Sequence, residues 1–393
     1  MKKLLLVFTL FCSIAASAQL ELIILDAKKL RENRSRVNNK DESLSAAYKE
    51  LIKDADKALN QGPFSVTEKK QLPPSGDKHD YMSLAPYHWP DPGKKDGLPY
   101  IRKDGQTNPE VKEYKDKEYL PIFSDLVYTL SLAYYFSGNE AYAQHASLLI
   151  KTWFLDTATR MNPNLNYAQA IKGEVEGRGA GIIDARHFMK VIESARLLNG
   201  SKKWKTEDLK NLKTWFTQFL NWLQTSPNGI HELNAKNNHG TWYDAQRLAY
   251  ALFIDSTNLA KKIVASAQER LDYQMDNEGK FPKEMERTIA LHYTVFNLDA
   301  YFMIASMADK LGTNFWNYTS PSGKSLKKGF DFIYPILIKE KEWTGQQIKP
   351  FDFENAYFIL AKAGAIYKCK KCMQAIKEIS DEKINRNRLW LLY

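Results

Sequence analysis

Residues 117–155 read KEYLPIFSDLVYTLSLAYYFSGNEAYAQHASLLIKTWFL. Apolar residues recur there at three- and four-residue spacing, as at Leu126 and Leu130, and the run is broken once at Ser137-Gly138-Asn139. This spacing predicts a helix over 117–137, a turn, and a second helix over 139–155. The stretch therefore indicates that the fold is assembled from helix pairs.

The same periodicity continues along most of the chain. Further helices are predicted near 44–60, 182–199, 206–224, 243–254, 257–274, 288–310, 325–339 and 353–366. Strand-like alternation is scarce, and no repeat of fixed period is visible, which argues against a solenoid of near-identical units. We expect an all-α fold in which paired helices close into a ring or superhelix.

The N-terminus, MKKLLLVFTLFCSIAASAQ, has two lysines, a short apolar run and the small residues Ala16-Ser17-Ala18. This pattern predicts a cleavable signal peptide over 1–18 and a periplasmic or secreted protein. A lipoprotein would use Cys12, but the bulky Phe11 before it argues against that alternative. No later stretch is apolar enough to span a membrane, and no composition shift divides 19–393, so we expect one domain there.

The chain carries a formal net charge of +10, or +8 without Lys2 and Lys3, and 12% aromatic residues. Such a chain could bind nucleic acid, a membrane surface or an acidic polymer. Its basic residues are scattered rather than clustered, so export favours an acidic polysaccharide as partner over nucleic acid or membrane. Cys369 and Cys372 form a single C-x-x-C, which indicates a local disulfide or two helical thiols rather than zinc.

Residues 62–112 break the helical pattern with eight of the fifteen prolines. The stretch includes YMSLAPYHWPDPGKKDGLPYIRKDGQTNPE, which is rich in Tyr, His and Trp. Long ordered loops in compact proteins are usually functional. We therefore expect this loop to lie across a binding face.

NNHGTWYD, residues 237–244, interrupts a helical region with polar residues. Asn238 is a candidate cap for a helix that begins near Thr241, with His239 in the turn. Asn and His side chains can also donate to a carboxylate, and the rings of Trp242 and Tyr243 could stack on a sugar. The stretch is thus a candidate both for a helix start and for a binding site.

EMERTIALHYTVFNLDAY, residues 284–301, contains Arg287 and Tyr293 beside apolar positions. Residues six apart on a continuous helix are rotated by roughly 240° from one another. If the two share a site, Arg287 must lie in or before the first turn of the helix. The alternative is that Tyr293 is a core tyrosine with a satisfied hydroxyl.

NPNLNYAQAIKGEVEGRGAGIIDAR, residues 162–186, lacks the glycine spacing of a nucleotide-binding loop. Its polar residues are interpreted as the basic lining of a sugar groove, namely Asn166, Gln169, Lys172 and Arg178. The seven histidines show no metal-binding pairing, and no G-x-S-x-G elbow is present. We expect neither a metal nor a cofactor.

Four motifs occur in order: MSLAPYHWPDP, NLNYAQ, NNHGTWYD and the Arg-x5-Tyr of RTIALHY. Together, over roughly residues 60–310, they resemble the alginate lyase domain of helical polysaccharide lyases, as in polysaccharide lyase families 5 and 38. The resemblance implies an (α/α) toroid, an incomplete barrel of helix pairs with a deep groove. It also implies cleavage of uronate polymers by β-elimination.

The resemblance also implies roles for particular residues. Asn238 and His239, with Arg287, would neutralise the uronate carboxylate, and Tyr293 would be the catalytic acid and base. Groove residues would be Gln169, Tyr81, His88 and Trp89. Arg287 is expected to lower the pKa of Tyr293, since nearby positive charge favours a phenolate. His239 as the base would instead imply an anti geometry.

Alginate is the expected substrate, but the Arg–Tyr spacing is closer to the family-38 type, where glucuronan cleavage also occurs. Two other classes remain open. One is a glycoside hydrolase on a similar helical barrel, using two of Glu174, Glu176, Asp184 and Asp244. The other is a non-catalytic polysaccharide-binding protein. Endo or exo action and oligomeric state are left open.

Overall fold

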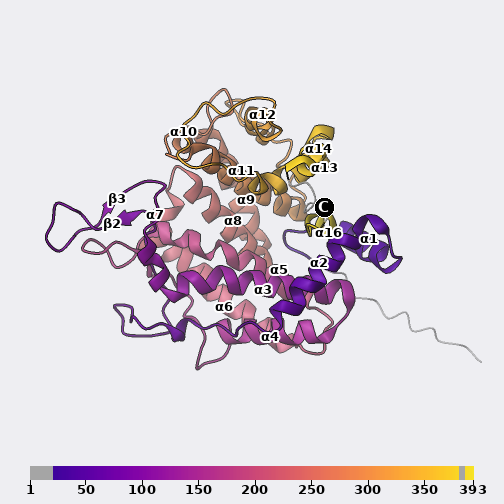
Figure 1. Cartoon of the computed structure of the whole chain (residues 1–393), viewed down its shortest axis with the longest axis horizontal. Coiled ribbons are helices and arrows are strands. Elements are labelled where there is room, and N and C mark those ends of the chain that lie inside the picture. Colours follow the sequence, from indigo (N-terminus) through magenta and orange to yellow (C-terminus); the bar gives the residue numbers. More distant parts are fainter. Residues whose placement is uncertain (1–20, 380–385) are drawn as a thin grey trace, which may run out of the picture.

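The computed structural model describes residues 21–379 and 386–393. The signal peptide expected over 1–18 therefore lies outside the described residues. The fold is all-α, as expected, and Figure 1 shows helix packed on helix with few strands. The α-helices are α1 (Ala27–Asn38), α2 (Glu42–Ala58), α3 (Lys115–Ser137), α4 (Glu140–Phe154), α5 (Phe188–Leu197), α6 (Thr206–Thr225), α7 (Pro227–Leu233), α8 (Asn238–Phe253), α9 (Thr257–Gln274), α10 (Pro282–Met285), α11 (Ala290–Ala308), α12 (Leu326–Leu337), α13 (Tyr357–Ile366), α14 (Lys370–Ile379) and α16 (Leu389–Leu392).

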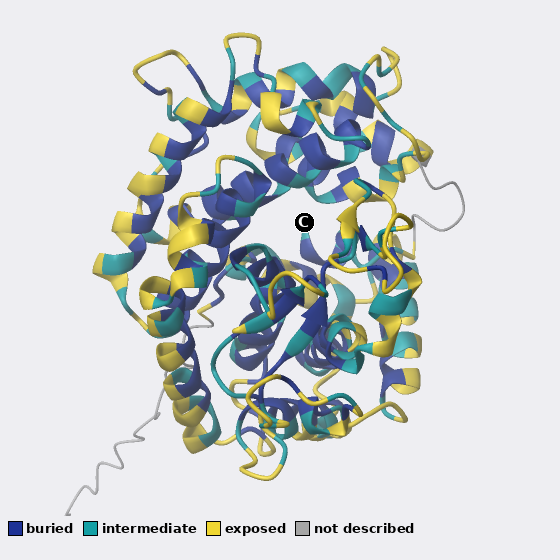
Figure 2. Cartoon of the chain, turned by 90° about the vertical axis from the view of Figure 1, so that its left-hand side faces the viewer, coloured by how far each residue is buried: buried dark blue, intermediate teal, exposed yellow. Residues whose placement is uncertain are grey.

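The helices pack as pairs of neighbours in the chain, which are linked into an incomplete (α/α) toroid. Pair α3–α4 joins α5, and pair α8–α9 joins α11. The stretch 117–155 forms α3 and α4 as predicted, and Gly138 between them has φ 73°, a conformation that glycine adopts readily. Figure 2 shows the helices with their buried residues on the sides that face neighbouring elements and their exposed residues on the outside.

The α3–α4 pair is held by aromatic packing. The ring of Phe123 on α3 stacks on that of Trp153 on α4 with centroids 4.8 Å apart and planes 8° apart. Phe154 then continues the contact toward Phe188 of α5, at 5.1 Å. These rings are almost fully buried, so they contribute a large share of the apolar area that stabilises the toroid.

The connections contain short strands and 3₁₀ helices. Strand β1 (Met82–Leu84) pairs in parallel with β4 (Tyr167–Ala170), and β2 (His88–Trp89) pairs antiparallel with β3 (Ile101–Arg102). The 3₁₀ helices are η1 (Val66–Glu68), η2 (Pro109–Glu113), η3 (Gly179–His187), η4 (Asp309–Leu311) and η5 (Phe353–Ala356). In Figure 1 the β2–β3 hairpin extends away from the helices.

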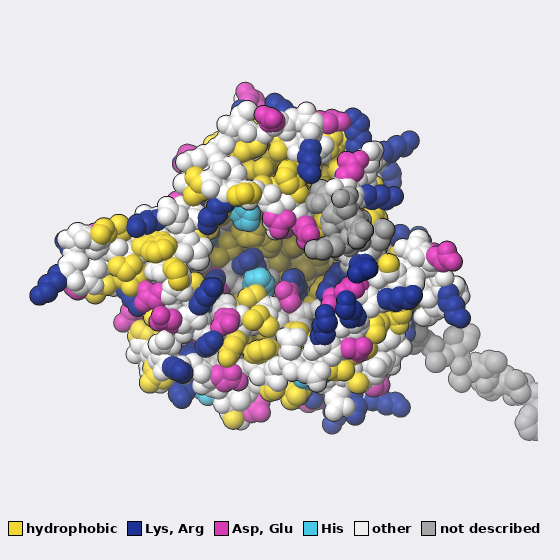
Figure 3. Space-filling model, in the orientation of Figure 1, with side chains coloured by type: hydrophobic (Ala, Val, Ile, Leu, Met, Phe, Trp, Pro, Cys, Tyr) yellow, Lys and Arg dark blue, Asp and Glu magenta, His cyan; other side chains and the backbone are white. Residues whose placement is uncertain are grey.

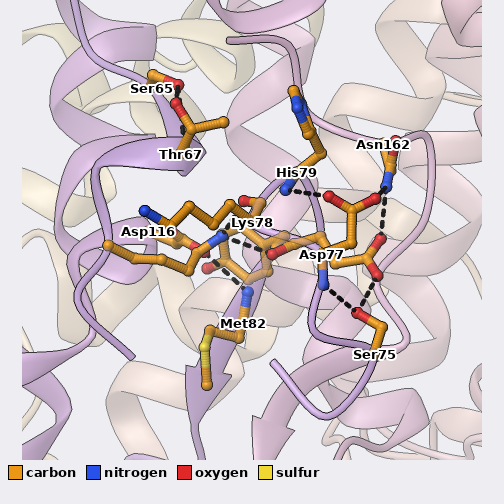
Figure 4. Close-up of polar contacts among 12 residues, drawn as sticks. Ser65, Thr67, Ser75, Asp77, Lys78, His79, Met82, Asp116 and Asn162 are labelled. Atoms are coloured by element: carbon orange, nitrogen blue, oxygen red, sulfur yellow. Dashed lines mark hydrogen bonds and ion pairs between the residues drawn. The ribbon is translucent and has the colours of Figure 1, made fainter. Parts of the chain in front are cut away.

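The first part of the proline-rich loop is fixed by a buried ion pair, whose surroundings appear in Figure 4. The Nζ of Lys69 lies 2.8 Å from Oδ2 of Asp116 and donates to the backbone oxygens of Lys78 and Asp80. The backbone N–H of Met82 donates to the same carboxylate at 2.9 Å. The stretch is thus an ordered loop, anchored to the start of α3 immediately before β1.

We expect Lys69→Met to lower the free energy of unfolding by about 3–5 kcal/mol, because it leaves a buried carboxylate without its cation. Urea unfolding followed by circular dichroism measures the effect. Lys70→Met is the matched control, since Lys70 is exposed and its removal should change little. Equal stability of the two variants would contradict the anchoring role of Lys69.

Near the C-terminus, Cys369 and Cys372 form a disulfide, which is one of the two alternatives expected for the C-x-x-C.

Among the described residues, no helix combines the length and apolarity needed to cross a membrane.

Candidate active site

A cavity of about 750 Å³ opens at the middle of the toroid. Figure 3 shows this hollow on one face of the molecule, with apolar, basic and histidine side chains around it. Its walls come from the start of α8, one face of α11, η3 and the strand β2. These elements lie far apart in the sequence, so the cavity exists only in the folded chain.

Arg287 and Tyr293 meet in this cavity. Arg287 lies in the turn between α10 and α11, before the helix begins at Ala290, as their six-residue spacing required. Its guanidinium carbon lies 3.6 Å from the centroid of the Tyr293 ring. The Tyr293 hydroxyl donates to the hydroxyl of Tyr87 at 2.9 Å, and both residues line the cavity.

Asp104 of the loop after β3 fixes Arg287 in place. Nε of Arg287 lies 3.1 Å from both carboxylate oxygens of Asp104, and Nη2 lies 2.7 Å from Oδ1. The N–H and hydroxyl of Thr288 donate to the same carboxylate at 3.1 Å. Although burial opposes it, this network holds the pKa of Asp104 well below its usual value. A fixed ion pair thus positions Arg287 on the tyrosine ring.

Burial raises the pKa of Tyr293 well above its usual value, even though Arg287 acts to lower it. Arg287 thus acts in the expected direction, but it does not bring this pKa below its usual value in the empty site. Desolvation of the phenolate outweighs the attraction of the guanidinium, whose charge is already shared with Asp104. Tyr293 is a neutral phenol in the empty site at neutral pH.

His239 and Asn238 are each held by a buried glutamate. Nδ1 of His239 lies 2.7 Å from Oε1 of Glu232, which leaves Nε2 as the ring nitrogen free for a ligand. The Asn238 backbone N–H and Nδ2 donate to Glu284 at 2.5 and 2.7 Å. Glu232 and Glu284 are 1% and 0% exposed; Glu232 belongs to the cavity lining beside His239, whereas Glu284 acts from behind it.

The helix start differs from the expectation for NNHGTWYD. Helix α8 begins at Asn238, not near Thr241, and neither Asn238 nor the N-cap residue Asn237 caps it through a side chain. Glu284 replaces the local cap, because its carboxylate accepts the first N–H of the helix from a distant part of the chain. His239 consequently lies in the first helical turn, where the backbone fixes its direction.

Four of the residues expected to bind the sugar line the cavity: Gln169, Arg178, His88 and Trp242. Gln169 has φ 51°, a strained conformation for a residue other than glycine, and its N–H donates to Ser83. Its Oε1 accepts from Arg178 at 3.1 Å. Burial, followed by the charges of Arg178 and Arg102, lowers the pKa of His88, which favours its neutral form.

Tyr81 and Tyr243 do not line the cavity, which corrects their assignment to the substrate. Tyr81 is fully buried and donates to Asp184, while Tyr243 is 1% exposed and donates to the backbone oxygen of Leu223 at 2.5 Å. Neither ring has a face open to a sugar. The spacing of residues in a short segment does not show whether an aromatic ring faces the cavity or is buried behind its wall.

Trp89 and Lys172 lie outside the cavity as well. Trp89 donates to the backbone oxygen of Gln106, which follows β3, and Lys172 forms an ion pair with Glu110. Trp242 does reach the cavity, but it is 3% exposed, and its ring packs on Phe296 at 4.8 Å. It forms part of the wall rather than an open stacking surface.

Several residues of the site were not predicted from the sequence. Tyr87 lies inside the motif LAPYHWP, and that motif was the signal that could have found it. Glu232, Glu284, Asp104 and Arg186 have no local signature, because each becomes relevant only through a partner or a cavity distant in sequence. In the described part of the chain, no group of three or more His, Cys, Asp or Glu could hold a metal ion.

The profile of the alginate lyase family matches residues 65–343. A crystal structure of an alginate lyase from Bacteroides ovatus is 42% identical and has a TM-score of 0.90, covering 95% of this chain and 99% of that one. The chain therefore belongs to the alginate lyase family, and it is a polysaccharide lyase.

More distant structures share the fold. Alginate lyase A1-III from Sphingomonas species A1 is 14% identical with a TM-score of 0.59, covering 94% of this chain and 97% of that one. A variant of A1-III complexed with tetrasaccharide has a TM-score of 0.54 at 14% identity, covering 88% and 94%. A comparison with curated protein sequences finds no match.

Proposed function

We propose that this lyase cleaves an acidic uronate polymer, alginate, by β-elimination. The observation that carries the proposal is the placement of Tyr293, Arg287, Asn238 and His239 around one cavity. The relatives support the substrate, since the Bacteroides ovatus protein is described as an alginate lyase and an A1-III variant was solved with a tetrasaccharide. The basic lining of the cavity suits a polyanion.

Removing the C5 proton of a uronate places negative charge on the neighbouring carboxylate. Donors preorganised toward that carboxylate stabilise the enolate-like transition state, and such electrostatic effects are usually the largest in catalysis. His239 is placed to donate from Nε2 when protonated, since Glu232 holds its other nitrogen. Its imidazolium would be balanced by Glu232 behind it and by the carboxylate in front.

Asn238 requires a change in Glu284 before it can donate to the substrate. In the empty site Nδ2 donates to Glu284, and the buried Oδ1 has no hydrogen-bond partner among the described residues. Burial raises the pKa of Glu284, which favours a protonated carboxyl. A protonated Glu284 donates to Oδ1 once the amide has turned over, which releases Nδ2 from Glu284 for donation to the substrate.

Tyr293 is assigned the proton transfers. Its phenolate takes the C5 proton, the electron pair of that bond forms the C4–C5 double bond, and the C4–O4 bond breaks. The same hydroxyl then returns a proton to the departing O4. Arg287, held by Asp104 against the ring, stabilises the phenolate. Tyr87, which accepts from the neutral Tyr293 hydroxyl, donates to the phenolate oxygen once that proton has left. His239 is the alternative base.

The hydrolase alternative has poor geometry. Asp184 is buried and accepts from Tyr81, Ser83 and Gln169, while Asp244 is buried in an ion pair with Arg270 at 2.6 Å. Glu174 and Glu176 are exposed and are not among the residues that line the cavity. No two of these carboxylates face one sugar. Glucuronan remains the second candidate substrate, because glucuronate carries the same C5 proton and carboxylate.

We also propose that the protein acts outside the cytoplasm. The sequence MKKLLLVFTLFCSIAASAQ supports export, and a large extracellular polymer is the substrate class that an exported lyase would meet.

The assay is incubation of the purified mature protein with alginate, glucuronan and a neutral glycan, followed by ultraviolet absorbance of the unsaturated uronate. We expect the absorbance to rise with alginate and not with the neutral glycan. New reducing ends without the absorbance would show hydrolysis, and a signal from glucuronan alone would replace alginate as the substrate.

A further inference from the structure

The cavity extends along α11 beyond the catalytic residues. Tyr293, Phe296, Asp299 and Met303 recur at three- and four-residue spacing, and all of them line it. At 1.5 Å per residue, Tyr293 and Met303 are roughly 15 Å apart along the helix axis. This part of the cavity has no assigned role in the elimination.

Most cations of the cavity are already paired. Lys117 pairs with Asp184, Lys190 with Asp125, and both Arg102 and Arg287 pair with Asp104. These pairs cannot bind a substrate carboxylate without first giving up their partners. A cation of the cavity that lacks an acidic partner therefore differs from these four.

Arg186, near the end of η3, has no acidic partner within 4.0 Å among the described residues. Its Nη1 donates to the backbone oxygen of Ile183 at 3.0 Å, and its guanidinium carbon lies 5.5 Å from the centroid of the Phe296 ring. Burial lowers its pKa, which reports the cost of holding this charge away from water. A partly buried, unpaired guanidinium that lines a cavity is suited to bind an anion.

Asp299 lies on the same wall, and no hydrogen bond or ion pair of its carboxyl is found among the described residues. Its Oδ1 is buried and forms no hydrogen bond in the described part of the chain. Burial raises its pKa to about 7, against the attraction of Arg186, so much of it is a neutral acid that can donate to a hydroxyl. An anion beside Arg186 is therefore not strongly opposed by this carboxyl.

Arg178, at the opposite end of η3, also lines the cavity without an acidic partner in the described chain. A 3₁₀ helix rises by about 2.0 Å per residue, so the two arginines are roughly 16 Å apart along η3. Both arginines belong to the lining that also contains Tyr293 and His239. Arg178 was expected in a sugar groove, whereas Arg186 was not.

We propose that Arg186 and Asp299 form a separate uronate subsite, in which the Arg186 guanidinium binds the carboxylate of a sugar away from the scissile bond and Asp299 contacts a hydroxyl of that sugar. This inference rests on the proposed function. It makes Arg186 a residue that recognises the acidic polymer without taking part in proton transfer.

The test is calorimetric binding of an alginate tetrasaccharide to the full mature protein carrying Tyr293→Phe, which prevents turnover. Adding Arg186→Gln should weaken binding by at least about tenfold, because a hydrogen-bonded charge pair is lost. Arg31→Gln is the matched control, since Arg31 is exposed outside the cavity and the same net charge is removed. A tetrasaccharide with its carboxylates reduced to alcohols should not distinguish Arg186→Gln from its parent.

Arg186→Lys provides a second variant that keeps the charge. We expect it to fold like the parent by thermal unfolding and to lose less affinity than Arg186→Gln, because lysine keeps the positive charge. Some loss should remain, since lysine cannot form the two-pronged contact. Unchanged affinity in both Arg186 variants would overturn the subsite alone. An equal loss in Arg31→Gln would also overturn it, and failure of the parent to bind any uronate would overturn the proposed function with it.

Discussion

Tyr293→Phe is expected to lower kcat on alginate by about a thousandfold while leaving tetrasaccharide binding nearly unchanged. The substitution removes the oxygen atom to which we assign both proton transfers. General acid–base catalysis of this kind typically raises a rate 10²–10⁴-fold. The ring stays in place under Arg287, 3.6 Å from its guanidinium carbon, so the cavity should keep its shape. Initial rates of unsaturated-uronate formation and calorimetry give the two quantities.

Tyr318→Phe is the control, since it makes the same change on a half-buried tyrosine that does not line the cavity. The raised pKa of Tyr293 adds a second expectation, because only a small fraction is phenolate near pH 7. The kcat/KM of the unsubstituted protein should therefore rise as the pH increases from 7 toward 9. Substantial residual activity in Tyr293→Phe would remove this tyrosine from the mechanism.

His239→Ala is expected to lower kcat by about 10²–10³-fold, the loss typical of removing one preorganised donor from a developing negative charge. The cavity loses the ring whose Nε2 is free, and Glu232 is left as a buried carboxylate without its partner. The first change should lower the rate and the second should lower the stability. Rates and thermal unfolding should therefore be measured on the same preparation.

His145→Ala provides the comparison, because the hydrogen bond of the His145 ring goes to the backbone oxygen of Gln61 and His145 does not line the cavity. We expect it to keep its activity. If His239→Ala reduced the stability but not the rate of the folded fraction, His239 would be a helix-start residue only. A rate loss with unchanged KM would indicate that it acts mainly in the transition state.

The helices were largely predictable from local pattern. The expected segments 206–224 and 257–274 correspond to α6 and α9 within one residue, because their amphipathic periodicity runs from end to end. Helix α1 was missed, since its sequence AKKLRENRSRVN is mostly polar and packs only through residues such as Leu30. The start of α8 was placed several residues late, because its cap comes from Glu284 rather than from its own neighbours.

The candidate site was predicted in part. The motifs identified Tyr293, Arg287, His239 and Asn238, and the helix geometry placed Arg287 before α11 from the sequence alone. The same motifs also suggested Tyr81 and Tyr243, whose hydroxyls instead bind within the core. An aromatic residue in a motif looks the same whether it faces a groove or supports the wall behind it.

The sequence by itself determined the helical class and the residue types of the catalytic centre, because periodicity and short motifs are local properties. Only the tertiary structure decided how those residues are held and charged. Tyr87 lies 206 residues from Tyr293, and Asp104 lies 183 residues from Arg287. Burial, ion pairing and the direction of each pKa shift arise from such contacts, since they depend on which distant groups exclude water from the same space.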